Sequence, residues 1–234
     1  MCTVTFIPQA RDGFILTSNR DESPTRKTLP PQTYQVNGAD LVFPRDELAG
    51  GTWFGHNKKG RLICLLNGGF RAHERQASYR MSRGIIVTEL LTAADALQTA
   101  SRFDFHDIEP FTIVLVDWMN ETMLHEIVWD GKQAHIEEKS LAPHIWSSSL
   151  LYTEEVKQKR KDWFSTFLFE TLAPSEDEIL KFHRTAGDGN PETDLVMDRG
   201  FVKTKSITSF VKLAKTSYMN YEDLETHQAT QIAV

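Results

Sequence analysis

The chain has 234 residues, of which 40% are hydrophobic and 25% are charged, and its formal net charge is −6. These values are typical of a globular protein with a packed core, and the acidic balance argues against a nucleic-acid partner. No apolar stretch approaches the length of a membrane span, and no secretion signal is recognisable at the N-terminus, so we expect a cytoplasmic protein without a membrane span.

The first elements expected along the chain are two strands that form a hairpin. Residues 3–7 alternate polar and apolar side chains, and residues 14–19 form the returning strand after the Asp12-Gly13 turn. Such a hairpin folds the segment Asn19-Arg20-Asp21 back toward Cys2. Asn19 and Asp21 are then expected on one face of the second strand, with Arg20 on the other.

The next stretch, residues 23–49, is rich in Pro, Arg and Asp and contains Pro30-Pro31. It is predicted to be a long surface excursion with one short strand at residues 41–43. The glycine-rich segment that follows contains Trp53 and Phe54, which would either line a cleft or close the core.

Residues 61–67 are almost continuously apolar, which is typical of a strand buried on both faces. Cys64, in the middle of this run, is interpreted as a buried structural thiol, and two cysteines do not form a disulfide framework. The strand ends at Asn67-Gly68-Gly69. Asn67 is a candidate donor to an oxyanion, and the alternative is that it caps a turn with Gly68.

The remaining chain alternates helical and strand-like patterns. Helices are predicted over residues 82–102, dividing near Thr92, over 153–171, and over 175–183, where Ser175 and Glu178 form a capping box. The basic run 157–161 is interpreted as the solvated face of the helix predicted over residues 153–171. Further strands are predicted at 111–118, 123–129, 134–138, 144–149, 201–213 and 218–224. This order indicates an α+β fold with helices packed outside the sheets, in a single domain spanning residues 1–234.

Cys2 is the candidate nucleophile. Removal of Met1 would leave a thiol and a free α-amine on one residue, and their reference pKa values, about 8.5 and about 7.7–8.0, are close enough for proton exchange near neutral pH. The alternative is a small apolar residue at the start of a buried strand. The histidines show no paired ligand spacing, and no nucleotide-binding motif occurs, so neither a metal nor another cofactor is expected.

Four motifs, in this order and spacing, carry a family resemblance: Met1-Cys2-Thr3, then residues 18–22 (Ser-Asn-Arg-Asp-Glu), then residues 50–55 (Gly-Gly-Thr-Trp-Phe-Gly), then residues 67–69 (Asn-Gly-Gly). Together they resemble the Transport and Golgi Organisation family, also called the NRDE family. That family is grouped with the N-terminal nucleophile (Ntn) hydrolases, and the start of the chain is similar to the branch of bile-salt hydrolases and penicillin V acylases.

The resemblance implies a four-layer αββα sandwich, with two antiparallel sheets flanked by helices. It also implies that Cys2 is the nucleophile, that Asp21 holds the α-amine and that Asn67 helps to form the oxyanion hole. The chain departs from the acylase pattern at Ser18, where that branch has an arginine. Ser148 stands where a second asparagine is expected, and Lys205 lies near the position of a late arginine.

Two functions remain open from the sequence, together with a purely structural domain that would leave the motifs unexplained. The first is an N-terminal cysteine hydrolase that cleaves a non-peptide amide, thioester or ester. In such a hydrolase, Arg20 would form a structural ion pair or bind a carboxylate of the substrate. Asn19 and Trp53 would support the site or bind substrate. The second is a catalytically silent protein that binds or transports a small hydrophobic ligand. The oligomeric state is unknown in both.

Overall fold

The computed structural model describes residues 3–214 and 216–233. Contacts along the chain divide it into two compact units. Unit 1 comprises residues 1–26, 142–147 and 152–234, and unit 2 comprises residues 27–141 and 148–151. The expectation that residues 1–234 form a single domain stays a prediction.

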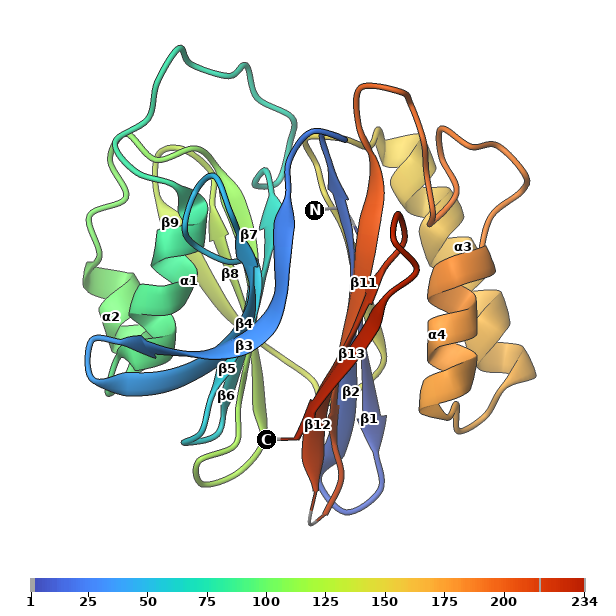
Figure 1. Ribbon diagram of the computed structural model, residues 1–234, viewed down its shortest axis with the longest axis horizontal. Coiled ribbons are helices and arrows are strands. Elements are labelled where there is room, and N and C mark those ends of the chain that lie inside the picture. Colours follow the sequence, from blue (N-terminus) through green and yellow to red (C-terminus); the bar gives the residue numbers. More distant parts are fainter. Residues whose placement is uncertain (1–2, 215, 234) are drawn as a thin grey trace. The chain divides into compact units, whose positions relative to one another are not determined.

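Unit 1 is built on a six-stranded antiparallel sheet with two helices on one face (Figure 1). Its strands, in spatial order, are β10 (His144–Ser147), β1 (Thr3–Gln9), β2 (Gly13–Glu22), β11 (Lys203–Lys212), β12 (Ser217–Asp223) and β13 (Ala229–Ala233). Its helices are α3 (Glu154–Glu170) and α4 (Glu176–Thr185). Apolar side chains of the sheet and of both helices form one buried cluster, which includes Ile7, Ile15, Val211, Phe164, Ile179 and Phe182.

The predicted N-terminal hairpin is confirmed. β1 and β2 pair antiparallel, with Thr3 opposite Asn19 and Gln9 opposite Gly13. Arg11 and Asp12, in the turn, have φ values of 59° and 57°. On its other side β2 pairs with β11, where Ile207 lies opposite Asn19 and a register shift separates Thr204 from Ser206.

Unit 2 is built on a seven-stranded antiparallel sheet, and its helices are α1 (Arg83–Thr92) and α2 (Ala96–Arg102). Its strands, in spatial order, are β3 (Thr28–Val36), β4 (Ala39–Asp46), β5 (Phe54–Asn57), β6 (Arg61–Asn67), β7 (Phe111–Asp117), β8 (Met123–Trp129) and β9 (Ala134–Lys139). Helix α1 packs against β4, β5 and β6. Cys64 in β6 is fully buried, as predicted.

The helices begin and end close to the predicted positions. The long helical pattern is divided after Thr92, as expected. Ser175 caps α4 through the predicted capping box: its hydroxyl accepts from the backbone N–H of Glu178, and the Glu178 carboxylate accepts from the backbone N–H of Ser175 at 2.8 Å. The α+β class, with two antiparallel sheets flanked by helices, is therefore confirmed.

The expectation of a long surface excursion over residues 23–49 is wrong. Most of that stretch forms the β3–β4 hairpin, which turns at Asn37-Gly38, where both residues have positive φ. The two prolines are tolerated because β3 is an edge strand, and its pairing with β4 shifts register between Leu29 and Gln32, where they lie. Two further strands, β5 and β13, were also not predicted.

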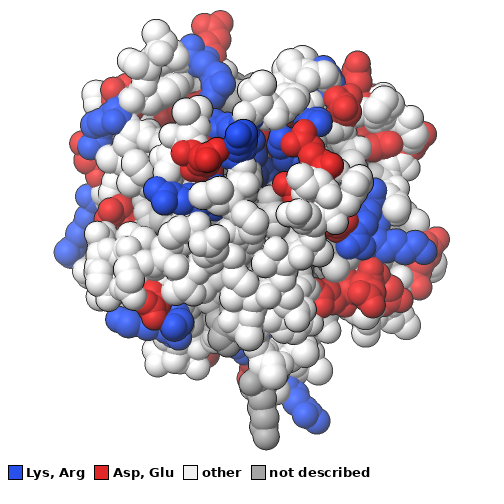
Figure 2. Space-filling model, viewed as in Figure 1, with Lys and Arg blue, Asp and Glu red and all other residues white. Residues whose placement is uncertain are grey.

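The interpretation of the basic run 157–161 as solvated is wrong for one residue. Arg160 in α3 has 0% exposure, whereas Lys161 is exposed. On the face seen in Figure 2, Lys and Arg side chains are interspersed with Asp and Glu side chains, except over a largely uncharged area in its lower centre. In the part of the chain that the structure describes, no helix is both long and apolar enough to cross a membrane.

Candidate functional site

Asp21, at the end of β2, is a buried carboxylate whose two oxygens are both fixed. The Tyr152 hydroxyl donates to Oδ2 at 2.7 Å, and the Thr204 hydroxyl donates to Oδ1 at 2.5 Å. The Thr204 oxygen also accepts the backbone N–H of Met197 at 2.9 Å. The orientation of the Asp21 carboxylate is thus set by one residue that precedes α3 and one from β11.

Asn19 lies on the same face of β2 as Asp21, as predicted. Its Nδ2 donates to the backbone oxygens of His183 at 3.0 Å and Leu195 at 2.8 Å, so its Oδ1 is the atom that faces His183 Nδ1 at 2.6 Å. The Leu195 oxygen also lies 3.3 Å from the Thr204 hydroxyl that holds Asp21. The Asn19 side chain therefore joins β2 to α4, two residues before Asp21.

His183 is neutral in this environment. Burial, together with the charge of Arg160, lowers its pKa to about 3. Its Nδ1 donates to Asn19, and its Nε2 accepts from the Thr5 hydroxyl at 2.7 Å. Both ring nitrogens are thereby satisfied in one tautomer, and a second proton on the ring would lose the bond to Thr5.

Arg20 and Lys205 are the buried cations among the predicted site residues. Arg20 is 2% exposed and lies on the face of β2 opposite Asn19, where its Nη2 is 3.7 Å from a Glu22 oxygen. Lys205 is 5% exposed, donates to the Pro24 carbonyl at 2.7 Å and pairs with Glu225. Ser18, which stands where the acylase pattern has an arginine, is fully buried on the Arg20 face.

In unit 2, Asn67 is held by its backbone and not by its side chain. Its carbonyl accepts the Ser148 hydroxyl at 2.6 Å, and the next residue, Gly68, donates its N–H to the Pro110 carbonyl at 2.9 Å. Among residues 3–214 and 216–233, none forms a hydrogen bond with the half-buried Asn67 amide. Ser148 thus lies next to Asn67, and its hydroxyl helps to fix the position of the Asn67 backbone.

Trp53 is 3% exposed, and its carbonyl accepts the N–H of Leu65 in β6 at 2.8 Å. Of the two roles left open for it, burial in the core fits this environment better than exposure in a cleft. Cys2, the predicted nucleophile, lies outside the described residues.

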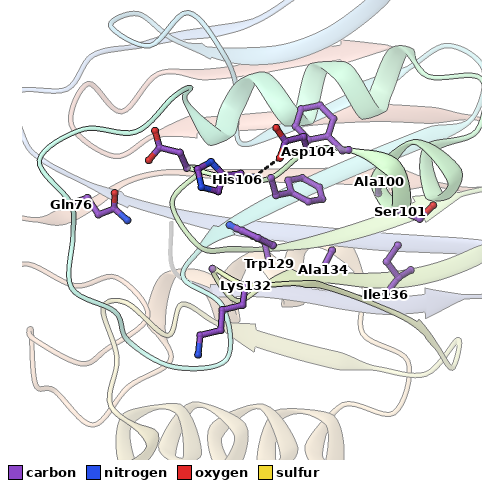
Figure 3. Close-up of a pocket in the computed structure, with 13 residues that line it drawn as sticks. Gln76, Ala100, Ser101, Asp104, His106, Trp129, Lys132, Ala134 and Ile136 are labelled. Atoms are coloured by element: carbon purple, nitrogen blue, oxygen red, sulfur yellow. Dashed lines mark hydrogen bonds between the residues drawn. The ribbon is translucent and has the colours of Figure 1, made fainter.

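A pocket of about 810 Å³ in unit 2 is a separate feature (Figure 3). It lies between the segment after α2 and the β8–β9 turn, with Trp129 and Lys132 on one side and Asp104 and His106 on the other. Among the residues that the structure describes, no predicted site residue lines it. The described part of the chain also contains no group of three or more His, Cys, Asp or Glu side chains that could hold a metal ion.

Residues 1–219 match the family described as Transport and Golgi organisation 2. The chain belongs to this family. The resemblance seen in the first third of the sequence therefore extends over most of the chain. A comparison with curated proteins finds no match.

Solved structures with the same fold come from the Ntn hydrolases. A variant of conjugated bile acid hydrolase from Clostridium perfringens is 10% identical with a TM-score of 0.60, and the match covers 99% of this chain and 92% of that one. The Caenorhabditis elegans ortholog of N-acylethanolamine-hydrolyzing acid amidase is 13% identical with a TM-score of 0.65 and full coverage of both chains. Penicillin V acylase from Agrobacterium tumefaciens is 12% identical with a TM-score of 0.56, covering 100% of this chain and 86% of that one. At these identities the likeness shows the fold alone.

Four residues that contact Asp21, Asn19 or Thr3 in unit 1 are not predicted from the sequence. They are Tyr152, Arg160, His183 and Thr204. One signal was available for His183, because it lies on the same helical face as Ile179 and Phe182, which are both buried. Tyr152 precedes a helix and Arg160 lies within a basic run, and neither position carries a pattern that marks a buried polar residue.

Proposed function

We propose that this protein is an N-terminal cysteine hydrolase that cleaves a non-peptide amide bond, or a thioester or ester, after Met1 has been removed. The observation that carries the proposal is the β1–β2 hairpin, in which Thr3 pairs with Asn19. Cys2 is joined to Thr3 by one peptide bond in the chain. Asp21, two residues after Asn19, is the nearby carboxylate that would hold the α-amine.

The chemistry follows from a thiol and an amine on the same residue. The α-amine of Cys2 takes the thiol proton as sulfur attacks the substrate carbonyl. The C–N bond then breaks, and the leaving amine takes that proton from the α-ammonium group. Water attacks the resulting acyl-cysteine with the α-amine as base, which releases the acid and restores the thiol. Asp21 orients the amine throughout.

Asn67 is proposed as the donor that stabilises the oxyanion. Its side-chain amide has no partner among the described residues, while its backbone is fixed by Ser148 and by the bond from Gly68 to Pro110. A donor that is positioned but uncommitted is suited to this role, and such donors contribute about 3–4 kcal/mol. The names of the solved relatives, a hydrolase, an amidase and an acylase, further support cleavage of an acyl bond.

A catalytically silent protein that binds or transports a small hydrophobic ligand is the second candidate. The observation that favours it is the Ser148 hydroxyl, which donates to the Asn67 carbonyl and so does not supply a second oxyanion donor. The description of the family, moreover, names transport and no reaction.

The test is a panel of acyl amides, acyl thioesters and acyl esters with matched acyl chains, incubated with the wild type, Cys2→Ala and Cys64→Ala. We expect hydrolysis by the wild type and by Cys64→Ala, and none by Cys2→Ala. Binding of the acyl probes to wild type and Cys2→Ala alike, with no hydrolysis by either, would support the silent protein instead.

A further inference from the structure

Arg160 is a fully buried cation held almost entirely by neutral groups. Its guanidinium donates to the backbone oxygen of Thr193 at 3.0 and 3.2 Å, to that of Asp194 at 2.7 Å and to the Thr3 hydroxyl. It also lies over the ring of Tyr152, with Cζ 3.7 Å from the ring centroid. Burying a cation is costly unless its donors are satisfied, so this arrangement fixes the guanidinium in one position.

Arg160 reaches the candidate site by two routes. One is its bond to the hydroxyl of Thr3, the residue that follows Cys2 in the chain. The other is through Tyr152, whose ring stacks on the guanidinium and whose hydroxyl donates to Asp21 at 2.7 Å. A single side chain from α3 is thereby connected to the start of β1 and to the carboxylate at the end of β2.

We propose that Tyr152 and Arg160 are positioning residues that align Asp21 and the start of β1 for the chemistry of Cys2. This inference rests on the proposed function. The guanidinium over the ring draws electron density from the phenol, which makes its O–H a stronger donor to a carboxylate. The same cation binds Thr3, the residue that follows Cys2, so the start of β1 and the carboxylate proposed to serve the amine are both connected to one group. Neither Tyr152 nor Arg160 is placed in contact with substrate.

The Tyr152→Phe variant tests this role because it removes one hydroxyl and leaves the ring under Arg160. The matched control is Tyr218→Phe, since the Tyr218 hydroxyl also donates to a carboxylate of unit 1, that of Glu176, at 2.7 Å. Both variants are made in a Cys64→Ala chain, so that Cys2 is the one thiol. The readout is the rate of Cys2 alkylation by iodoacetamide as a function of pH, with the thermal unfolding midpoint measured in parallel.

We expect Tyr152→Phe to alkylate about tenfold more slowly at pH 7, the effect of losing one hydrogen bond to a charged group. The midpoint of its pH profile should move up toward the value of about 8.5 of an ordinary thiol. Tyr218→Phe should match the parent in both respects. Arg160→Lys, if it folds, should behave like Tyr152→Phe, because an ammonium group does not reproduce the planar stack on the ring.

An alkylation rate and pH profile of Tyr152→Phe equal to those of the parent would overturn the positioning role while leaving the proposed function intact. A parent whose Cys2 reacts no faster than a cysteine in an unfolded peptide would overturn both. A slower rate with an unchanged pH profile in both tyrosine variants would indicate a general structural effect, and would also overturn the positioning role.

Discussion

Asn19 and His183 are joined by two hydrogen bonds that run in opposite directions. His183 donates its Nδ1 hydrogen to Asn19 Oδ1 at 2.6 Å, and Asn19 Nδ2 donates to the backbone oxygen of His183 at 3.0 Å. This reciprocal pair attaches α4 to β2 one residue away from the Arg20-Asp21 segment. The stability of the site therefore depends on a histidine that remains neutral.

The first prediction concerns pH. Burial, with the Arg160 charge, lowers the pKa of His183 to about 3, and burial lowers that of His56 to about 4. Both histidines take up protons near pH 6.5 when the chain is unfolded, so the unfolded state binds more protons between about pH 6.5 and 4. The free energy of unfolding should therefore fall as the pH decreases through this range, by about 1.4 kcal/mol per pH unit for each histidine.

Urea unfolding at pH 7 and pH 5 measures this loss. His183→Gln should reduce the dependence on pH by about half, whereas His106→Gln, at an exposed position, should leave it unchanged. Equal or greater stability at pH 5 than at pH 7 would show that these histidines are not buried in their neutral form.

The second prediction concerns Asn67. Asn67→Ala should leave the unfolding free energy nearly unchanged, because the side-chain amide has no partner among the described residues. It should nevertheless lower kcat by about 10²–10³-fold, as expected for the loss of an oxyanion donor. The contrasting variant is Asn57→Ala, which removes a bond to the Leu91 carbonyl at 2.7 Å and should be destabilising. An Asn67→Ala variant with normal kcat would remove Asn67 from the mechanism.

The third prediction concerns the glycine after Asn67. Gly68 has φ +88°, and a Cβ at this position would lie 2.4 Å from the Ser149 hydroxyl and 2.9 Å from the Leu150 nitrogen. Gly38 has φ +77° with nothing within 4 Å, so Gly38→Ala measures the backbone cost alone. Gly38→Ala should cost about 1 kcal/mol, and Gly68→Ala should cost more because it also displaces the segment from Ser148 to Leu150. Equal costs in thermal unfolding would show that this close approach is absent.

The fourth prediction concerns Ser148, whose hydroxyl holds the Asn67 carbonyl at 2.6 Å. Ser148→Ala should lower the unfolding free energy by about 1 kcal/mol, the usual net value of one hydrogen bond. On the proposed role of Asn67 as an oxyanion donor, Ser148→Ala should also lower kcat more than it raises KM, since a displaced donor would stabilise the transition state less well. Ser148→Thr retains the hydroxyl and should restore part of the rate. A Ser148→Ala variant with unchanged kcat would show that Ser148 does not position Asn67.

The sequence predicted elements best where one local signal dominated. The continuous apolar run from Arg61 to Asn67 is a strand with the predicted bounds, and the capping box at Ser175 and Glu178 begins α4 as expected. The β3–β4 hairpin is not predicted because Pro30-Pro31 argue against a strand in this stretch. Prolines exclude a central strand and not an edge strand, and edge position is a property of the whole sheet.

The candidate site was predictable only where it coincides with a motif. Asp21 and Asn67 stand out because they lie at or near the end of a strand, and Asn19 because it belongs to the same motif as Asp21. In the sequence, nothing distinguishes Arg160 from the other basic residues of its helix. Its guanidinium is buried against the backbone carbonyls of Thr193 and Asp194, which lie more than thirty residues away in the chain. Such a partnership arises from tertiary packing and leaves no local pattern in the sequence.

The central claim is that Cys2 acts through a thiol and a free α-amine on the same residue. The most direct measurement is the mass of the N-terminal peptide of the purified protein. We expect a peptide that begins at Cys2, without Met1 and with an unmodified amine. A peptide that retains Met1, or one whose Cys2 nitrogen is acetylated, would contradict it, because the nitrogen would then be an amide and could not accept the thiol proton.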